Sequence, residues 1–243
     1  MNKIQQEKFL DYLSSYLTEN KKNKIENIST FRTNYLSIVL EDITEPKDAS
    51  AVIRSCECFG IQQINIIENN TRYRINPDVT MGSSKWVDIH HYKASNIPLS
   101  PFKVEAKKGD EGNTEVCLKD LKKQGYKIVA MSNHQNSISI NNFPLENKLA
   151  FVFASEGNDL SLSVTANSDY IAKVPSYGFT GSFNLSVDAA MVIHTFINRL
   201  KGSNIEWRLN QDEILELKLK WVKKILKRSD LLEQKFLEIQ KLS

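Results

Sequence analysis

The sequence has little glycine, few cysteines and no long apolar run. Its 9 glycines in 243 residues are too few for a collagen or a glycine-rich linker. The longest uninterrupted apolar run is 149–154, whereas a membrane-spanning helix needs about 18 to 20 residues. The first ten residues contain no apolar signal core. We therefore expect a protein that is neither secreted nor embedded in a membrane.

The cysteine count and the charge balance narrow the class of protein further. Cys56, Cys58 and Cys117 are odd in number and lack a framework spacing, which predicts reduced thiols and a cytoplasmic location. No further Cys/His pair stands at a zinc-finger spacing from Cys56 and Cys58, so we predict no metal site. The 32 Lys and Arg against 29 Asp and Glu give a net charge of +3. This excludes a strongly basic tail protein, but a local basic patch would suffice for nucleic-acid binding.

Familiar catalytic fingerprints are also missing. The sequence has no G-x-G-x-x-G after the first predicted strand, no G-x-x-x-x-G-K-[ST], no G-x-S-x-G and no H-E-x-x-H. His90 and His91 are adjacent, so in a strand they would point to opposite faces. We interpret all four histidines as structural or surface residues.

Short apolar runs alternate with helix-like segments through the middle of the chain. We predict strands at 35–40, 64–67, 86–92, 126–131, 149–154 and 170–174, and helices at 49–59, 114–124 and 185–200. Asp48 and Gly60 are the predicted N-cap and C-cap of the first of these helices, and Thr114 is the predicted N-cap of the second. Strands that alternate with helices predict an α/β fold with a mainly parallel sheet.

The two ends of the chain differ from this middle part. We predict an N-terminal helical extension (1–29), a central domain (30–202) and a C-terminal helical extension (203–243), with one helix over 7–28. In the tail, apolar residues recur on one helix face. Six basic residues stand within 218–228 without an acidic one. That run is either a solvated helix face or a surface that contacts phosphates.

Three segments place unusual polar groups next to predicted strands and helices. Arg54 lies on an otherwise small and apolar predicted helix, so it either pairs with a carboxylate or faces a site. Glu156 follows a buried strand, where α/β proteins usually bind ligands. Segment 174–190 is a strand end, a glycine-containing loop and a helix start rich in hydroxyl and amide groups. Each segment alone is equally well explained as a loop with capping residues.

Together and in this order, the segments resemble the knotted SpoU/TrmH-type 2′-O-ribose methyltransferases of the SPOUT superfamily. The residues that match the family's three motifs are Arg54 and Gly60, then Glu156, Leu160 and Ser161, then Pro175, Gly178, Ser182, Asn184, Ser186, Ala189 and Ala190. The segment 76–86 is similar to the family's Gly-Ser-x-x-Trp segment. The tail over 207–236 is similar to the C-terminal helices of the tRNA-modifying branch.

This resemblance implies a parallel sheet flanked by helices, a C-terminal trefoil knot, a homodimer and S-adenosylmethionine as the cofactor. The implied cofactor-binding positions are Met131, Ala154, Glu156, Gly157, Val174, Pro175, Gly178 and Phe183. The implied catalytic residues are Arg54, Glu156, Ser182 and Asn184, and the RNA-binding residues are Arg54, Lys85, Lys223 and Lys224. The implied reaction is methyl transfer to a ribose 2′-hydroxyl of RNA. The tail helices and the segment 72–86 favour tRNA over rRNA, with D-loop guanosine 18 as the candidate nucleotide.

The family role of Arg54 is to contact the target ribose-phosphate and to assist removal of the hydroxyl proton. A guanidinium has a pKa above about 12 and is a poor proton acceptor, so phosphate orientation is the better defended role. Asp48 stands where the family usually has asparagine, and its carboxylate is an alternative proton acceptor. Ala154 and Asp159 replace two family glycines. An active methyltransferase and a non-catalytic RNA-binding protein with a weakened cofactor pocket therefore both remain open.

Overall fold

The computed structural model describes residues 2–93, 112–155 and 160–242. The chain divides into two compact units, one of Thr33–Trp207 and one of Met1–Arg32 with Arg208–Ser243. The two ends, predicted as separate extensions, thus belong to a single unit.

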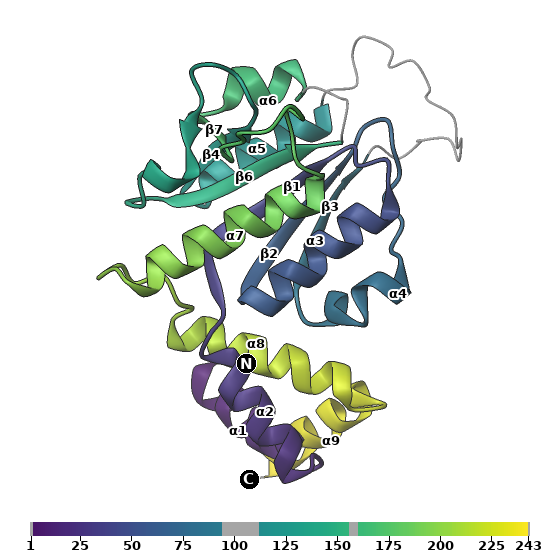
Figure 1. Cartoon of the computed structure of the whole chain (residues 1–243). Helices are drawn as coiled ribbons and strands as arrows, with labels where there is room; N and C mark the ends of the chain where they lie inside the picture. Colours follow the sequence, from purple (N-terminus) through teal and green to yellow (C-terminus); the bar gives the residue numbers. More distant parts are fainter. Residues whose placement is uncertain (1, 94–111, 156–159, 243) are drawn as a thin grey trace. The chain divides into compact units, whose positions relative to one another are not determined.

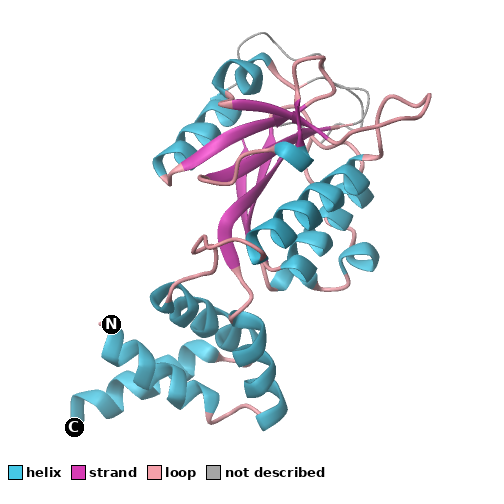
Figure 2. Cartoon of the chain, turned by 60° about the vertical axis from the view of Figure 1, so that its left-hand side comes forward, coloured by secondary structure: helices cyan, strands magenta, loops and turns pink. Residues whose placement is uncertain are grey.

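The unit 33–207 contains a seven-stranded parallel sheet (Figures 1 and 2). Its strands are β1 (Thr33–Glu41), β2 (Ile61–Glu68), β3 (Asp88–Lys93), β4 (Tyr126–Met131), β5 (Ile138–Ser139), β6 (Lys148–Ala154) and β7 (Tyr170–Lys173). They pair in the order β3-β2-β1-β6-β4-β7-β5, and every pair is parallel. The predicted α/β fold with a parallel sheet is confirmed.

Helices cover both faces of this sheet (Figure 2). They are α3 (Pro46–Phe59), α4 (Pro77–Thr80), α5 (Gly112–Lys123), α6 (Leu162–Asn167) and α7 (Leu185–Lys201), with 3₁₀ turns η1 (Ser83–Lys85) and η2 (Ile140–Asn142). One buried core joins α3 and α7 to the sheet, and a second joins α5 and α6 to its other face. In the first core, the rings of Phe151 and Phe196 lie 4.7 Å apart and connect β6 to α7.

Three predicted boundaries are wrong, because proline and tertiary contacts override the local cap signals. Helix α3 begins at Pro46, whose fixed φ suits a first helical position, so Asp48 lies in the first turn and not at the N-cap. Helix α5 begins at Gly112, and Thr114 is buried inside it and not at its N-cap. Strand β3 begins at Asp88, because Trp86 closes η1. The predicted C-cap Gly60 is confirmed, with a left-handed φ of 84°.

The other unit is made of α1 (Lys3–Ser14), α2 (Glu19–Ser29), α8 (Gln211–Ile225) and α9 (Ser229–Leu242). Its buried core consists of Phe9, Leu13, Leu17, Leu215, Leu219, Val222 and Phe236. The single helix predicted over 7–28 is wrong: the chain turns at 15–18, where Leu17 enters the core and Thr18 is extended. The tail likewise forms two helices, separated next to Arg228, which has a φ of 61°.

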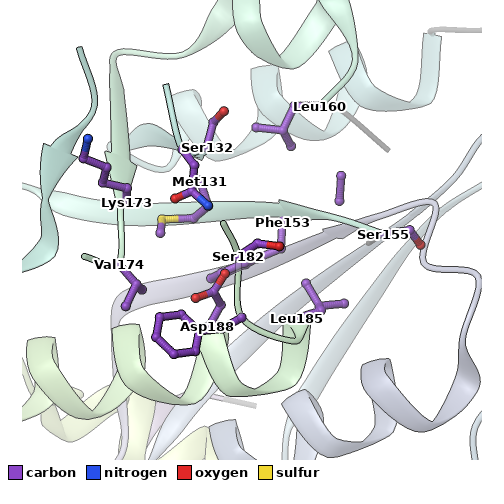
Figure 3. A pocket seen from close by; sticks show the side chains of 13 residues that line it. Met131, Ser132, Phe153, Ser155, Leu160, Lys173, Val174, Ser182, Leu185 and Asp188 are labelled. Atoms are coloured by element: carbon purple, nitrogen blue, oxygen red, sulfur yellow. The ribbon is translucent and has the colours of Figure 1, made fainter. Parts of the chain in front are cut away.

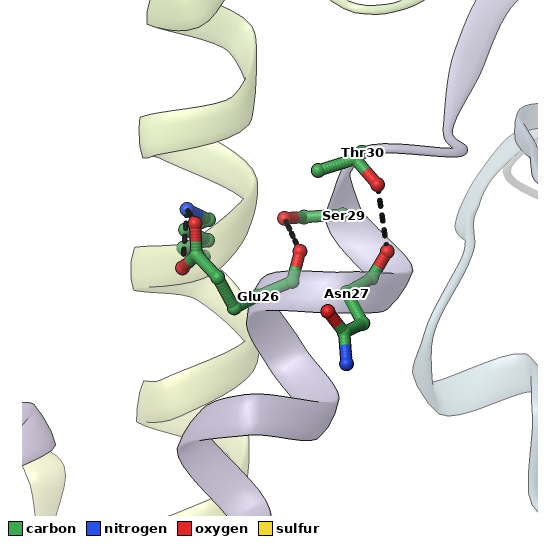
Figure 4. A network of polar contacts seen from close by, with 5 residues as sticks. Glu26, Asn27, Ser29 and Thr30 are labelled. Carbon is green, nitrogen blue, oxygen red and sulfur yellow. Dashed lines mark hydrogen bonds and ion pairs between the residues drawn. The ribbon is translucent and has the colours of Figure 1, made fainter.

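Polar contacts join α2 to α8 within this unit (Figure 4). Lys218 Nζ of α8 lies 2.6 Å from Glu26 Oε1 of α2. At the C-terminal end of α2, the hydroxyls of Ser29 and Thr30 donate to the carbonyl oxygens of Glu26 and Asn27, at 2.9 and 2.8 Å.

Among the described helices of the whole chain, none is long and apolar enough to cross a membrane.

Candidate active site

A cavity of about 330 Å³ opens at the carboxyl ends of β4, β6 and β7, beside the start of α7 (Figure 3). It is lined by Met131, Ser132, Asn133, Phe153, Ala154, Ser155, Leu160, Lys173, Val174, Ser182, Phe183, Leu185 and Asp188. Parallel sheets bind ligands at this edge, because the loops that follow the strands converge there. The volume falls within the range of about 300 to 1,000 Å³ found for small-molecule sites.

The lining combines apolar side chains with a few charged and hydroxyl groups. Asp188 lies in the first turn of α7, where a negative charge is favoured by the helix dipole. Lys173 ends β7, and its Nζ donates to the carbonyl oxygen of His134 at 3.4 Å. The cavity can therefore contact a ligand that carries both positive and negative groups.

Strand β6 delivers Ala154 and Ser155 to the cavity. Ala154 is not among the described non-glycine residues with positive φ, so the backbone here does not require the glycine found in the family. The Ser155 hydroxyl accepts from Thr44 N at 2.7 Å and donates to the Asp42 carbonyl oxygen at 3.0 Å. These bonds tie the end of β6 to the segment between β1 and α3.

Helix α3 presents Arg54 to solvent, and no described residue forms an ion pair with it. Six residues earlier, Asp48 Oδ1 accepts from Asn184 Nδ2 at 3.2 Å. Asn184 is the N-cap of α7, and its Oδ1 accepts from Ser186 N at 2.9 Å. The structure thus brings the first-motif helix and the third-motif helix together through Asp48 and Asn184.

The residues predicted for the cofactor divide into three groups. Met131, Ala154, Val174 and Phe183 line the cavity, as does the predicted catalytic residue Ser182. Pro175 and Gly178 lie in the loop after β7 but are not among the described residues that line the cavity. Glu156 and Gly157 lie outside the described residues.

The predicted RNA-binding lysines lie in both units. Lys85 is exposed at the end of η1, and Lys224 is exposed in the last turn of α8. Lys223 is half-buried: its Nζ lies 2.7 Å from Glu233 Oε2 and 5.2 Å from the ring centre of Phe9. Contacts from neighbouring helices therefore neutralise part of the basic run in the tail.

Sequence reasoning missed several lining residues, among them Ser132, Asn133, Lys173 and Asp188. The first two directly follow β4, and Lys173 ends β7, so the carboxyl-end rule for parallel strands would have found them. Asp188 lines the cavity because of how α7 is rotated on the sheet. A sequence pattern does not fix that rotation.

Comparison with known proteins decides the family. Residues 35–194, which include β1, α3, the cavity and the start of α7, match the SpoU rRNA Methylase family. The chain belongs to the SpoU rRNA methylase family. A family relative named tRNA (guanosine(18)-2′-O)-methyltransferase, from Borreliella burgdorferi, is 37% identical over 93% of this chain and 95% of its own length.

More distant family relatives agree. A tRNA (guanosine(18)-2′-O)-methyltransferase from Thermus thermophilus is 23% identical over 72% of this chain and 81% of its own length. A solved structure described as an A. aeolicus TrmH/SpoU tRNA modifying enzyme superposes with a TM-score of 0.69, at 21% identity, over 86% of this chain and 98% of its own. The structural likeness supports a SpoU fold for the chain.

Proposed function

We propose that this protein transfers a methyl group from S-adenosylmethionine to the ribose 2′-hydroxyl of guanosine 18 in tRNA. The observation that carries the proposal is the 37% identity to a protein named for this reaction, over 226 residues. That match covers 93% of the chain, so it extends beyond residues 35–194 into the helical ends. The tRNA substrate is therefore favoured over rRNA, although the family name refers to rRNA.

The described residues of the cavity fit S-adenosylmethionine. This cofactor carries an ammonium, a carboxylate, a sulfonium and two ribose hydroxyls. Asp188 complements the cationic groups, and Lys173 complements the carboxylate. Met131, Phe153 and Val174 supply apolar surface for an adenine ring. When bound, the cofactor supplies the methyl group and its own thioether leaving group.

Because the cofactor supplies the methyl group and the leaving group, the main task of the side chains around the cavity is to orient the target ribose of the RNA. We assign Arg54 to the phosphate next to the target ribose, since its guanidinium is exposed and can bind a phosphate with two parallel hydrogen bonds. Asn184 and Asp48 hold the start of α7 against α3, so they keep Ser182 and Arg54 in a fixed relation. Most of the rate enhancement then comes from orientation.

We also propose the trefoil knot and the homodimer. Strand β7 inserts between β4 and β5, which both precede it in the chain, and this order is compatible with a threaded C-terminal segment. Tyr177 and Phe179, in the loop after β7, are 96% and 113% exposed. Two such exposed aromatic side chains beside a cavity favour a protein partner, for which a second copy of the chain is the simplest. We place the protein in the cytoplasm, where tRNA is modified.

The proposed reaction is tested with two tRNA transcripts and labelled S-adenosylmethionine. One transcript carries guanosine at position 18, and the matched control carries 2′-deoxyguanosine there, so only the acceptor hydroxyl differs. We expect methyl transfer to the first transcript alone. Equal labelling of both would show that another nucleotide accepts the methyl group. If calorimetry shows binding of tRNA but not of S-adenosylmethionine, the non-catalytic alternative is favoured.

A further inference from the structure

A buried carboxylate ends β1, the strand that lies between β2 and β6 in the sheet. Glu41 is the last residue of β1 and is 4% exposed. Its Oε1 accepts from the hydroxyls of Thr114 and Ser161 at 2.7 and 2.8 Å, and its Oε2 accepts from Ser161 N at 3.1 Å. No lysine, arginine or histidine among the described residues pairs with it. Three donated hydrogen bonds thus stabilise a carboxylate buried without a cation.

The hydrogen bonds of Glu41 connect it to the cavity through Ser161. Ser161 is the N-cap of α6, and its neighbour Leu160 lines the cavity. On the opposite side, Thr114 belongs to α5, and its hydroxyl also accepts from Asn69 Nδ2 at 2.8 Å. Glu41 therefore fixes the start of α6 relative to the sheet and to α5.

Asp42 and Thr44, which follow Glu41 in the chain, fix a second wall of the cavity. Ser155, which also lines the cavity, is bonded to the Asp42 carbonyl oxygen and the Thr44 amide. Hydrogen bonds thus connect both walls of the cavity to the end of β1, and only Glu41 makes such bonds through a charged side chain. From this juxtaposition we propose that Glu41 is a positioning residue for the cofactor cavity: it acts through Ser161 to hold Leu160 against the ligand.

This inference rests on the proposed function, because the ligand is taken to be S-adenosylmethionine. Glu41 does not line the cavity, so its loss should weaken binding without changing the chemical step. Glu41→Gln keeps one acceptor oxygen but places an amide donor against Ser161 N, so one bond is lost. The typical net contribution of one intramolecular hydrogen bond corresponds to roughly fivefold to tenfold weaker binding.

Glu68 provides a matched control. It is a buried glutamate, 5% exposed, that ends the neighbouring strand β2 and bonds to His91 Nδ1 at 2.8 Å. It does not line the cavity. Glu68→Gln therefore makes the same chemical change at an equivalent depth, and a merely structural effect should appear in both variants.

The experiment measures the Kd of S-adenosylmethionine by calorimetry, and KM and kcat with tRNA, for the full-length wild type and both variants. We expect Glu41→Gln to raise Kd and KM for the cofactor and to leave kcat at saturation unchanged, while Glu68→Gln should change none of the three. Should Glu41→Gln not fold, Ser161→Ala replaces it and should raise Kd in the same way. Unchanged Kd in Glu41→Gln, or equal shifts in both glutamate variants, overturns the inference. A wild type that does not bind the cofactor overturns the proposed function itself.

Discussion

The side-chain amide of Asn184 donates a hydrogen bond of 3.2 Å to the carboxylate of Asp48. Asn184 is the N-cap of α7, and Asp48 lies in the first turn of α3. The contact therefore joins two segments that are 136 residues apart in the sequence. It also gives Asp48 a role that an asparagine could perform, because an amide oxygen accepts the same bond.

The first prediction follows from this contact. Asp48→Asn should keep kcat within about threefold of the wild type, since the hydrogen bond is retained in neutral form. Asn184→Ala should lose the bond and the N-cap of α7, lowering the free energy of unfolding by about 1 kcal/mol. The measurements are the pH profile of kcat and urea unfolding. If Asp48→Asn instead abolishes kcat and removes the acidic limb of the profile, Asp48 is the proton acceptor.

Arg54 allows a direct test of phosphate orientation. Arg54→Ala should lower kcat by about a hundredfold, the typical effect of misplacing a reacting group. Cofactor binding should persist, since Arg54 does not line the cavity. Lys119→Ala, which removes an exposed cation from α5 on the other face of the sheet, is the control and should leave kcat unchanged. Equal activity of Arg54→Ala and wild type would remove Arg54 from the reaction.

Asp169 gives a prediction for stability against pH. Burial raises its pKa, but hydrogen bonds from Ile128 N and the Lys127 ammonium outweigh this and hold the pKa below its usual value. A depressed pKa stabilises the fold above the unfolded-state pKa of about 4, and this contribution disappears as the pH falls through the folded value.

The comparison uses urea midpoints of the full chain between neutral and acidic pH. Asp169→Asn should be less stable than the wild type at neutral pH, and the difference should shrink below pH 4. Asp120→Asn is the control, because Asp120 pairs with Lys123 on an exposed helix surface, and no backbone amide of the described residues donates to its carboxylate. A constant difference for Asp169→Asn at all pH values would contradict the assignment.

The sequence predicts which helices and strands form better than it predicts the residues at which they begin and end. Strand β4 has the predicted bounds 126–131, because its apolar residues, interrupted only by the exposed Lys127, follow Gly125 and end before the polar Ser132 and Asn133. The N-terminus of α5 was misplaced, because Thr114 looks like a cap locally but is drawn into the core by its bond to Glu41. That bond joins residues 73 apart, and no local pattern contains it.

For the site, motif order predicts cavity residues on strand ends, such as Met131 and Val174. It does not predict Asp188, whose place depends on the packing of α7. Glu156 and Gly157 lie outside the described residues, so their roles stay predictions. Spacing therefore locates the site, and tertiary packing decides which side chains complete it.

Two adjacent lysines of the basic run in the tail, Lys223 and Lys224, lie in different surroundings. Lys223 binds Glu233 and lies over the ring of Phe9, so Lys223→Ala should destabilise the helical unit. Lys224 is exposed in the last turn of α8. If Lys224 contacts a phosphate, Lys224→Ala should lower the slope of log Kd against log salt by about 0.7 to 0.9. Filter binding of tRNA from low to moderate salt measures this slope, with Lys119→Ala as the charge-matched control. An unchanged slope in Lys224→Ala makes the tail a solvated helix face.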